Sequence, residues 1–126
     1  MNILDSSAWL EVLVDGKHAA VFLELIEGGQ LIVPSITIFE VTKRARLMGS
    51  ERDSQRIESH MRRHTVADLS AERASAASLV SAQHKLPMAD SIIYAAALEF
   101  GATVWTQDED FEGLPQVRYF SKKTRS

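Results

Sequence analysis

The sequence contains no cysteine, which excludes disulfide bonds, thiolate zinc sites and cysteine nucleophiles. No apolar run approaches the roughly 20 residues of a membrane-spanning helix, so we expect no membrane partner. The N-terminal segment has an acid at Asp5 and no basic region before an apolar stretch, which is unlike a secretory signal. No G-x-G-x-x-G pattern occurs, and this argues against a dinucleotide-binding enzyme. Together these absences favour a cytoplasmic protein.

The composition is that of an ordinary globular chain. Apolar residues make up 45% of the 126 positions and charged residues 25%, a balance that disordered chains do not have. A chain of this length can bury about two thirds of its unfolded surface, so it needs no cross-link or structural metal to hold a core. We therefore expect one domain over residues 1–126.

Charge is distributed in blocks of alternating sign. Residues 1–42 hold one basic and six acidic residues, and residues 65–112 hold two basic and eight acidic ones. Residues 43–64 hold seven basic and three acidic residues, and the tail is basic through Arg118, Lys122, Lys123 and Arg125. This pattern indicates a protein that gathers carboxylates in one place and presents cations to an anionic partner nearby. Alternatively, the arginines at positions 52, 56, 62 and 63 only line the solvent-exposed face of a helix.

Short apolar strands alternate with helices along the chain. Strands are predicted at 2–4, 31–33 and 102–105, with brief further strands at 65–66 and 116–120. Helices are predicted at 6–14, 17–27, 35–48, 51–63, 70–85 and 87–100, the first capped by Ser6 or Ser7. This alternation predicts βαβ units and a parallel sheet covered by helices on both faces, an α/β fold.

Acidic residues cluster around the predicted ends of these strands. Asp5 ends the first strand, Glu40 lies in the helix after the second, and Asp108 and Asp110 follow the strand at 102–105. Asp90 lies in the first turn of the helix at 87–100. Because open parallel sheets bind ligands outside the carboxyl ends of their strands, we expect these acids to converge.

Burial makes a divalent cation the expected partner of these acids. Glu40 and Asp90 have apolar neighbours in sequence, so we expect both to be buried. Inward-facing carboxylates are costly to desolvate and repel one another, and a hard divalent cation such as Mg²⁺ or Mn²⁺ relieves both costs.

Each acid also has a simpler interpretation. Asp90 could favour a helix N-terminus through the helix dipole, and Asp108–Asp110 could form a solvated turn. Glu40 could pair with Lys43 or Arg44 at helical spacing. All of these interpretations would have to hold together for a metal site to be absent.

Four segments, in this order, resemble the motifs of PIN-domain ribonucleases. They are Ile3-Leu4-Asp5-Ser6-Ser7, Phe39-Glu40-Val41, Leu86-Pro87-Met88-Ala89-Asp90-Ser91 and Thr106-Gln107-Asp108-Glu109-Asp110-Phe111. The length and the near-terminal first Asp are most similar to VapC-type toxins of toxin–antitoxin pairs. The resemblance implies a PIN-like three-layer α/β/α fold with a central parallel sheet of four or five strands. It also implies catalytic and metal-binding roles for Asp5, Glu40, Asp90 and Asp108, hydroxyl support from Ser6 and Thr106, and Asp110 as an alternative to Asp108.

The activity implied by the resemblance is Mg²⁺- or Mn²⁺-dependent cleavage of RNA phosphodiester bonds, with tRNA or ribosomal RNA as substrate. No histidine need act as a base, since His18, His60, His64 and His84 lack the spacing of ligands or of a catalytic triad. The phosphates of RNA would contact the basic stretch that begins with Lys43, Arg44 and Arg46. An aspartyl-phosphate enzyme is disfavoured because Ser7 stands where its second Asp is expected.

Partners are implied by the same resemblance. A VapC-type toxin would form a homodimer and be silenced by a small cognate antitoxin. Trp9, Leu13, Val21 and Phe22 are candidates for these interfaces, with core packing as their alternative role. Two other functions stay open: a housekeeping RNA-processing nuclease of the same fold, and a non-catalytic PIN-fold binding or regulatory module.

Overall fold

The fold was analysed in a computed structural model that describes residues 1–123, so Arg125 of the basic tail lies outside the described residues. The strands are β1 (Asn2–Leu4), β2 (Ile32–Pro34), β3 (Thr65–Ala67), β4 (Thr103–Thr106) and β5 (Val117–Tyr119). The helices are α1 (Ser6–Leu13), α2 (Ala19–Gly28), α3 (Ser35–Met48), α4 (Glu51–Met61), α5 (Ala71–His84) and α6 (Met88–Phe100), with a short 3₁₀ helix η1 (Glu109–Phe111). The alternation of elements predicted from the sequence is confirmed.

All strand pairs are parallel, but the strands form two ladders. β1, β4 and β5 make a three-stranded sheet, with Ile3 opposite Val104 and Val104 opposite Val117. β2 and β3 make a two-stranded ladder, with Val33 opposite Val66. A single bridge between Asn2 and Leu31 connects the two ladders. The contact between β1 and β2 is too short to make one continuous sheet, so the main parallel sheet has three strands rather than the expected four or five.

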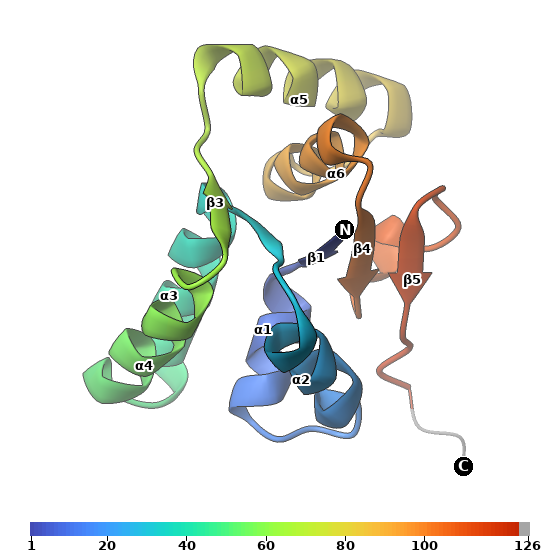
Figure 1. The fold of residues 1–126 in the computed structure, drawn as a ribbon. Coiled ribbons are helices and arrows are strands. Elements are labelled where there is room, and N and C mark those ends of the chain that lie inside the picture. Colours follow the sequence, from blue (N-terminus) through green and yellow to red (C-terminus); the bar gives the residue numbers. More distant parts are fainter. Residues whose placement is uncertain (124–126) are drawn as a thin grey trace.

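Helices cover both faces of these strands (Figure 1). Ile3, Ile32 and Val104 pack with residues of α5 and α6, whereas their neighbours Leu4 and Val33 pack with residues of α1 to α4. This alternation follows from the two-residue period of a strand, which points successive side chains to opposite faces. The α/β/α layering predicted from the sequence is confirmed.

The first helix is capped differently from the prediction. The side chain of Asp5 accepts a hydrogen bond from the Ala8 amide, so Asp5 is the N-cap, and Ser6 and Ser7 are the first residues of α1. A carboxylate at this position satisfies an amide that has no partner within the helix and faces the positive end of the helix dipole. The acid that ends β1 therefore also starts α1.

Two of the predicted interface residues belong to the core instead. Trp9 is 1% exposed and Phe22 is fully buried, so neither is a free contact surface, because both pack with Leu4, Val33 and Met61 inside the α1–α4 layer. Val21 is 38% exposed and Leu13 is partly exposed. Within residues 1–123, no helix combines the length and apolar character needed to cross a membrane.

The buried face of α4 supplies a stability test. Ser54 is fully buried, and its hydroxyl has no hydrogen-bond partner among the described residues. We expect Ser54→Ala to raise the free energy of unfolding by about 1 kcal/mol, because it removes an unpaired polar group and introduces a better helix former. Urea denaturation measures this change.

The matched control lies one turn further along the same helix. Ile57 is 6% exposed. Replacing it with Ala should lower the free energy of unfolding by about 2–4 kcal/mol, because the substitution leaves a cavity. A Ser54→Ala variant less stable than wild type would show that the hydroxyl bonds a buried water and that this account of Ser54 is wrong.

Candidate functional site

The acids predicted to converge lie at the carboxyl ends of the strands. Asp5 follows β1, and Asp108 comes two residues after the end of β4. Glu40 is in the second turn of α3, the helix that directly follows β2, and Asp90 is in the first turn of α6. Pro87 precedes α6 as its N-cap residue, and this fixes the turn from which Asp90 projects.

Asp5 is held by three donors. It is 2% exposed, and its Oδ1 accepts hydrogen bonds from the Ser7 hydroxyl at 2.6 Å and the Ala8 amide at 3.1 Å. Its Oδ2 accepts one from the Thr106 hydroxyl at 2.6 Å. These bonds connect the end of β1, the first turn of α1 and the end of β4, so the orientation of the carboxylate is fixed by three elements.

Each of the two hydroxyls also accepts a backbone hydrogen bond. Thr106 Oγ1 accepts from the Asp108 amide at 2.9 Å, and Ser7 Oγ accepts from the Gln107 amide at 2.9 Å. The Asp108 carboxylate in turn accepts from the Asp110 amide at 2.9 Å. A chain of hydrogen bonds thus runs from Asp5 through Thr106 into the loop after β4 and sets the position of Asp108.

Three of the carboxylates lie close enough to share one cation. Asp90, Asp108 and Asp110 each place a carboxylate oxygen within 4.8 Å of the others. The sequence left open whether Asp108 or Asp110 accompanies Asp90, and the structure brings both to it. Asp108 is half-buried and Asp110 is exposed, so Asp108 lies deeper in the cluster.

Burial raises the pKa values of two acids of the site, and the charge of Asp108 adds to both increases. Burial, followed by the charge of Asp108, raises the pKa of Asp90 from 3.8 to about 8, with smaller contributions from Asp5 and Asp110. Burial raises the pKa of Asp5 to about 6 against the lowering effect of its three hydrogen bonds, and Asp108 adds to the increase. Asp108 is therefore the charge that the other acids share as a neighbour.

Glu40 is also influenced by the charge of Asp108, but one of its carboxylate oxygens has no hydrogen-bond partner among the described residues. Burial raises the pKa of Glu40, a hydrogen bond from Ser6 lowers it, and the charge of Asp108 raises it further. The Glu40 Oε1 atom is buried and has no hydrogen-bond partner among the described residues. Glu40 and Asp90 were both expected to be buried, and both are half-buried in the structure.

Two residues of this network were not predicted from the sequence. Ser7 donates to Asp5, and Gln107 donates its amide to Ser7 and its side-chain nitrogen to the Ser7 carbonyl at 3.4 Å. The signal for Ser7 was present, since a hydroxyl two residues after a helix-capping Asp can reach the same carboxylate. Nothing in the sequence pattern marks Gln107, because its contact spans 100 residues of chain.

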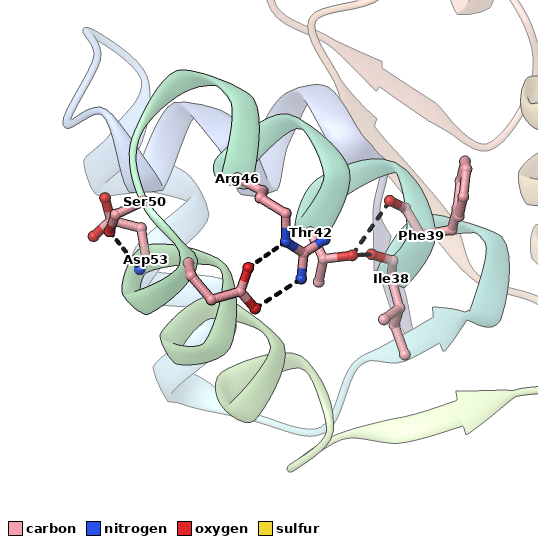
Figure 2. A network of polar contacts seen from close by, with 7 residues as sticks. Ile38, Phe39, Thr42, Arg46, Ser50 and Asp53 are labelled. Carbon is pink, nitrogen blue, oxygen red and sulfur yellow. Dashed lines mark hydrogen bonds and ion pairs between the residues drawn. The ribbon is translucent and has the colours of Figure 1, made fainter.

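The three predicted RNA-binding cations lie in different environments. Arg46 forms a two-point ion pair with Glu51 across α3 and α4, with Nη2 3.0 Å from Oε1 (Figure 2). Lys43 Nζ lies 5.8 Å from the centre of the exposed Phe39 ring. Arg44 lines a hollow beside Ser6 and Ser7. Of the three, Arg44 is the one placed next to the acidic network.

The histidines lie elsewhere in the fold. His64 Nδ1 accepts a hydrogen bond from the Leu31 amide at 3.0 Å, and His18 Nε2 lies 3.0 Å from the Ser121 carbonyl oxygen. His84 packs edge-on against Tyr94, and His60 lines a hollow with Trp9 and Ile57. The carboxylate cluster found within residues 1–123 contains no histidine.

Comparison with solved structures finds the same fold in several chains, and toxin–antitoxin complexes are among them. A toxin–antitoxin complex from Klebsiella pneumoniae matches with a TM-score of 0.81 and 22% identity, over 96% of this chain and 99% of that one. VapBC2 from Rickettsia felis, bound to a promoter DNA fragment, matches with a TM-score of 0.70 and 16% identity, over 94% and 96% of the chains. DNA-bound VapBC from Salmonella typhimurium matches with a TM-score of 0.70 and 21% identity, over 94% and 95%.

At these identities the similarity extends to the fold alone. No curated protein sequence matches the chain significantly. A family model described as the PIN domain matches residues 3–116, a range that contains all five acids of the site. Because this match extends over most of the chain, from β1 into the loop before β5, the chain belongs to the PIN domain family.

Proposed function

We propose that the protein is a Mg²⁺- or Mn²⁺-dependent endoribonuclease and the toxin of a toxin–antitoxin pair. The observation that carries this proposal is the convergence of acids from four distant segments at one sheet edge, with Asp90, Asp108 and Asp110 within 4.8 Å of one another. Membership of the PIN family supports a nuclease. A cluster of carboxylates with no histidine beside it is suited to phosphodiester hydrolysis that depends on a metal rather than on a side-chain base.

The residues present fit a divalent cation. Asp90, Asp108 and Asp110 offer three oxygens within reach of one ion, and the unpartnered Oε1 of Glu40 is a further oxygen ligand or an acceptor for a metal-bound water. The Asp5 carboxylate accepts three hydrogen bonds, so its orientation toward such an ion would already be set. Bound there, the cation would supply an activated water and would neutralise charge on the leaving oxygen.

The protein's own contribution is preorganisation. Ser7 and Thr106 fix the Asp5 carboxylate, and the amides of Gln107 and Asp108 fix the two hydroxyls in turn. The carboxylates of Asp5 and Asp108 are therefore held in place before a substrate phosphate arrives, a condition that favours catalysis by electrostatic stabilisation. We assign supporting roles to two hydroxyls, that of Thr106, which donates to Asp5, and that of Ser6, which donates to Glu40.

The toxin assignment rests on the structural neighbours, which are toxin–antitoxin complexes. A small cognate antitoxin is proposed for this chain on that basis. A homodimer and a tRNA or ribosomal RNA substrate are proposed from the resemblance of its motifs to those of VapC-type toxins. A housekeeping RNA-processing nuclease is the second candidate, and a small reading frame directly upstream of the gene distinguishes the toxin from it. A non-catalytic module predicts the loss of one of the acids, and all of them are present.

The first activity prediction concerns the metal. Purified protein should cleave structured RNA in the presence of Mg²⁺ or Mn²⁺, and EDTA should stop the cleavage. The reason is that the site holds carboxylates and no histidine that could act as a base without a metal. Asp5→Asn and Asp90→Asn should each lower the cleavage rate by at least about 100-fold. Gel analysis of labelled RNA measures both effects.

His84→Ala serves as the control, because His84 packs against Tyr94 and is not one of the clustered acids or their hydrogen-bond partners. It should keep the wild-type cleavage rate. Cleavage that persists in excess chelator would contradict the proposed function.

A second prediction concerns stability and pH without metal. Asp90 binds its proton far more tightly when folded, with a pKa of about 8 against 3.8, so the metal-free protein should lose stability as pH rises through that interval. Asp90→Asn removes the charge with little change in volume. In EDTA the variant should melt higher than wild type at about pH 8.5, and this difference should shrink steadily as the pH falls toward about 4.

Millimolar Mg²⁺ should raise the melting temperature of the wild type by mass action and that of Asp90→Asn much less. Thermal unfolding in the two buffers measures this. Equal responses to Mg²⁺, or an Asp90→Asn variant less stable than wild type in EDTA at high pH, would show that Asp90 has a structural role only.

A third prediction concerns partners. The protein should elute as a dimer in size-exclusion chromatography and should bind the product of an adjacent small gene. Leu13 and Val21 keep exposed surface and remain candidates for these contacts. A monomer with no affinity for any neighbouring gene product would argue for the housekeeping nuclease.

A further inference from the structure

Two hollows of about 360 Å³ each adjoin the loop after β4 and share three lining residues: Ser7, Gln107 and Lys122. The first is lined by Asp108, Glu109, Asp110 and Tyr119 as well, and so opens onto the carboxylates. The second is lined by Arg44 and Met48 of α3 and by Leu10, Glu11 and Val14. Lys122 therefore lies between the acidic cluster and Arg44, although 78 positions separate the two cations in the sequence.

The segment that carries Lys122 is held in place on the body of the protein. The Phe120 amide donates to the Thr106 carbonyl at 2.8 Å, and the Phe120 ring stacks on Trp105 and packs edge-on against Phe22. Beyond Phe120, Lys17 Nζ donates to the Lys123 carbonyl at 3.0 Å, and His18 lies against the Ser121 carbonyl. Contacts on both sides of Lys122 thus fix its backbone beside the site.

Among the described residues, Arg44 and Lys122 are not engaged in ion pairs, in contrast to three other arginines. Arg46, Arg62 and Arg73 are paired with Glu51, Glu58 and Glu99. Neither Arg44 nor Lys122 has a carboxylate oxygen within 4.0 Å in the part of the chain that the structure describes. Glu11 is the acid that lines the hollow between them, and its Oε2 accepts a hydrogen bond from the His18 amide at 3.1 Å.

Cations at this place answer an electrostatic requirement of the proposed reaction. An RNA backbone that approaches five acids is repelled, and a divalent cation offsets only part of their charge. Positive groups beside the cluster restore attraction for the phosphates on either side of the bond to be cut. Lys122 lines the same hollow as Asp108 and Asp110, and Arg44 lines the adjoining one, which Ser7 and Gln107 share with the first.

We propose that Arg44 and Lys122 form a phosphate-binding subsite that positions the backbone of single-stranded RNA next to the carboxylate cluster. This inference rests on the proposed ribonuclease function and adds a residue from the C-terminal segment to it. Arg46 is not part of the subsite, because Glu51 already neutralises it. Both residues position substrate and take no part in the chemistry.

The test measures binding and cleavage separately. Binding of a fluorescein-labelled, mixed-sequence single-stranded oligoribonucleotide is followed by anisotropy in the Asp90→Asn background, which does not cleave. Arg44→Gln and Lys122→Gln should each weaken binding about five-fold at 0.1 M salt, and the double variant should lower the log–log salt slope by about 1.4. In the active background these variants should raise KM and leave kcat at saturating RNA unchanged.

Charge-conserving and remote variants are the controls. Arg44→Lys and Lys122→Arg should recover most of the binding, which a role in packing alone would not predict. Arg52→Gln, an exposed arginine of α4 that lines neither hollow, should bind and cleave like wild type. It removes the same charge as each test variant and so controls for net charge.

The outcomes separate the two proposals. Metal-dependent cleavage by wild type with an unchanged KM in the Arg44→Gln Lys122→Gln variant would overturn the subsite and leave the ribonuclease function intact. A loss in Arg52→Gln as large as in the test variants would also overturn it, since attraction would then depend on total charge. Wild-type protein that neither binds nor cleaves RNA would overturn both.

Discussion

The carboxylate of Asp5 is the group on which the rest of the site depends. Asp5 directly follows β1 and caps α1, and its carboxylate accepts a hydrogen bond from the Thr106 hydroxyl at the end of β4. A buried carboxylate is stable here because three donors replace the water that it loses. One side chain therefore joins a strand end, a helix start and the loop after β4, and Thr106 connects it to Asp108.

The acids of the site repel one another, and this repulsion lowers the stability of the folded protein. Asp90, Asp108 and Asp110 crowd together while Glu40 leaves a buried oxygen unpartnered. Two apolar layers on opposite faces of the strands, around Ile3 on one side and Leu4 on the other, hold the elements that carry these acids. Packing of this kind gives the rigidity that keeps like charges close, and a bound cation would relieve the strain.

The alternating charge blocks of the sequence acquire a meaning only in three dimensions. The basic block of residues 43–64 begins on α3, and two of its seven basic residues, Arg46 and Arg62, are paired with Glu51 and Glu58. The basic C-terminal segment runs back beside the loop after β4, where Phe120 anchors it. One unengaged cation from each block, Arg44 and Lys122, thereby flanks the same group of acids.

The sequence by itself determined the alternation of strands and helices, the parallel sheet and the identity of the acids. These features follow from local periodicity, from turn residues such as Pro87 and Gly101, and from the rule that parallel strands end at a common edge. The tertiary structure decided that Asp5 rather than a serine caps α1, that Trp9 and Phe22 are core residues, and that Ser7, Gln107 and Lys122 join the site. The roles of Trp9, Phe22, Gln107 and Lys122 depend on contacts between residues that are distant in the chain. The cap of α1 and the role of Ser7 depend on which of several neighbouring side chains bonds a given group. Neither kind of contact leaves a periodic signal in the sequence.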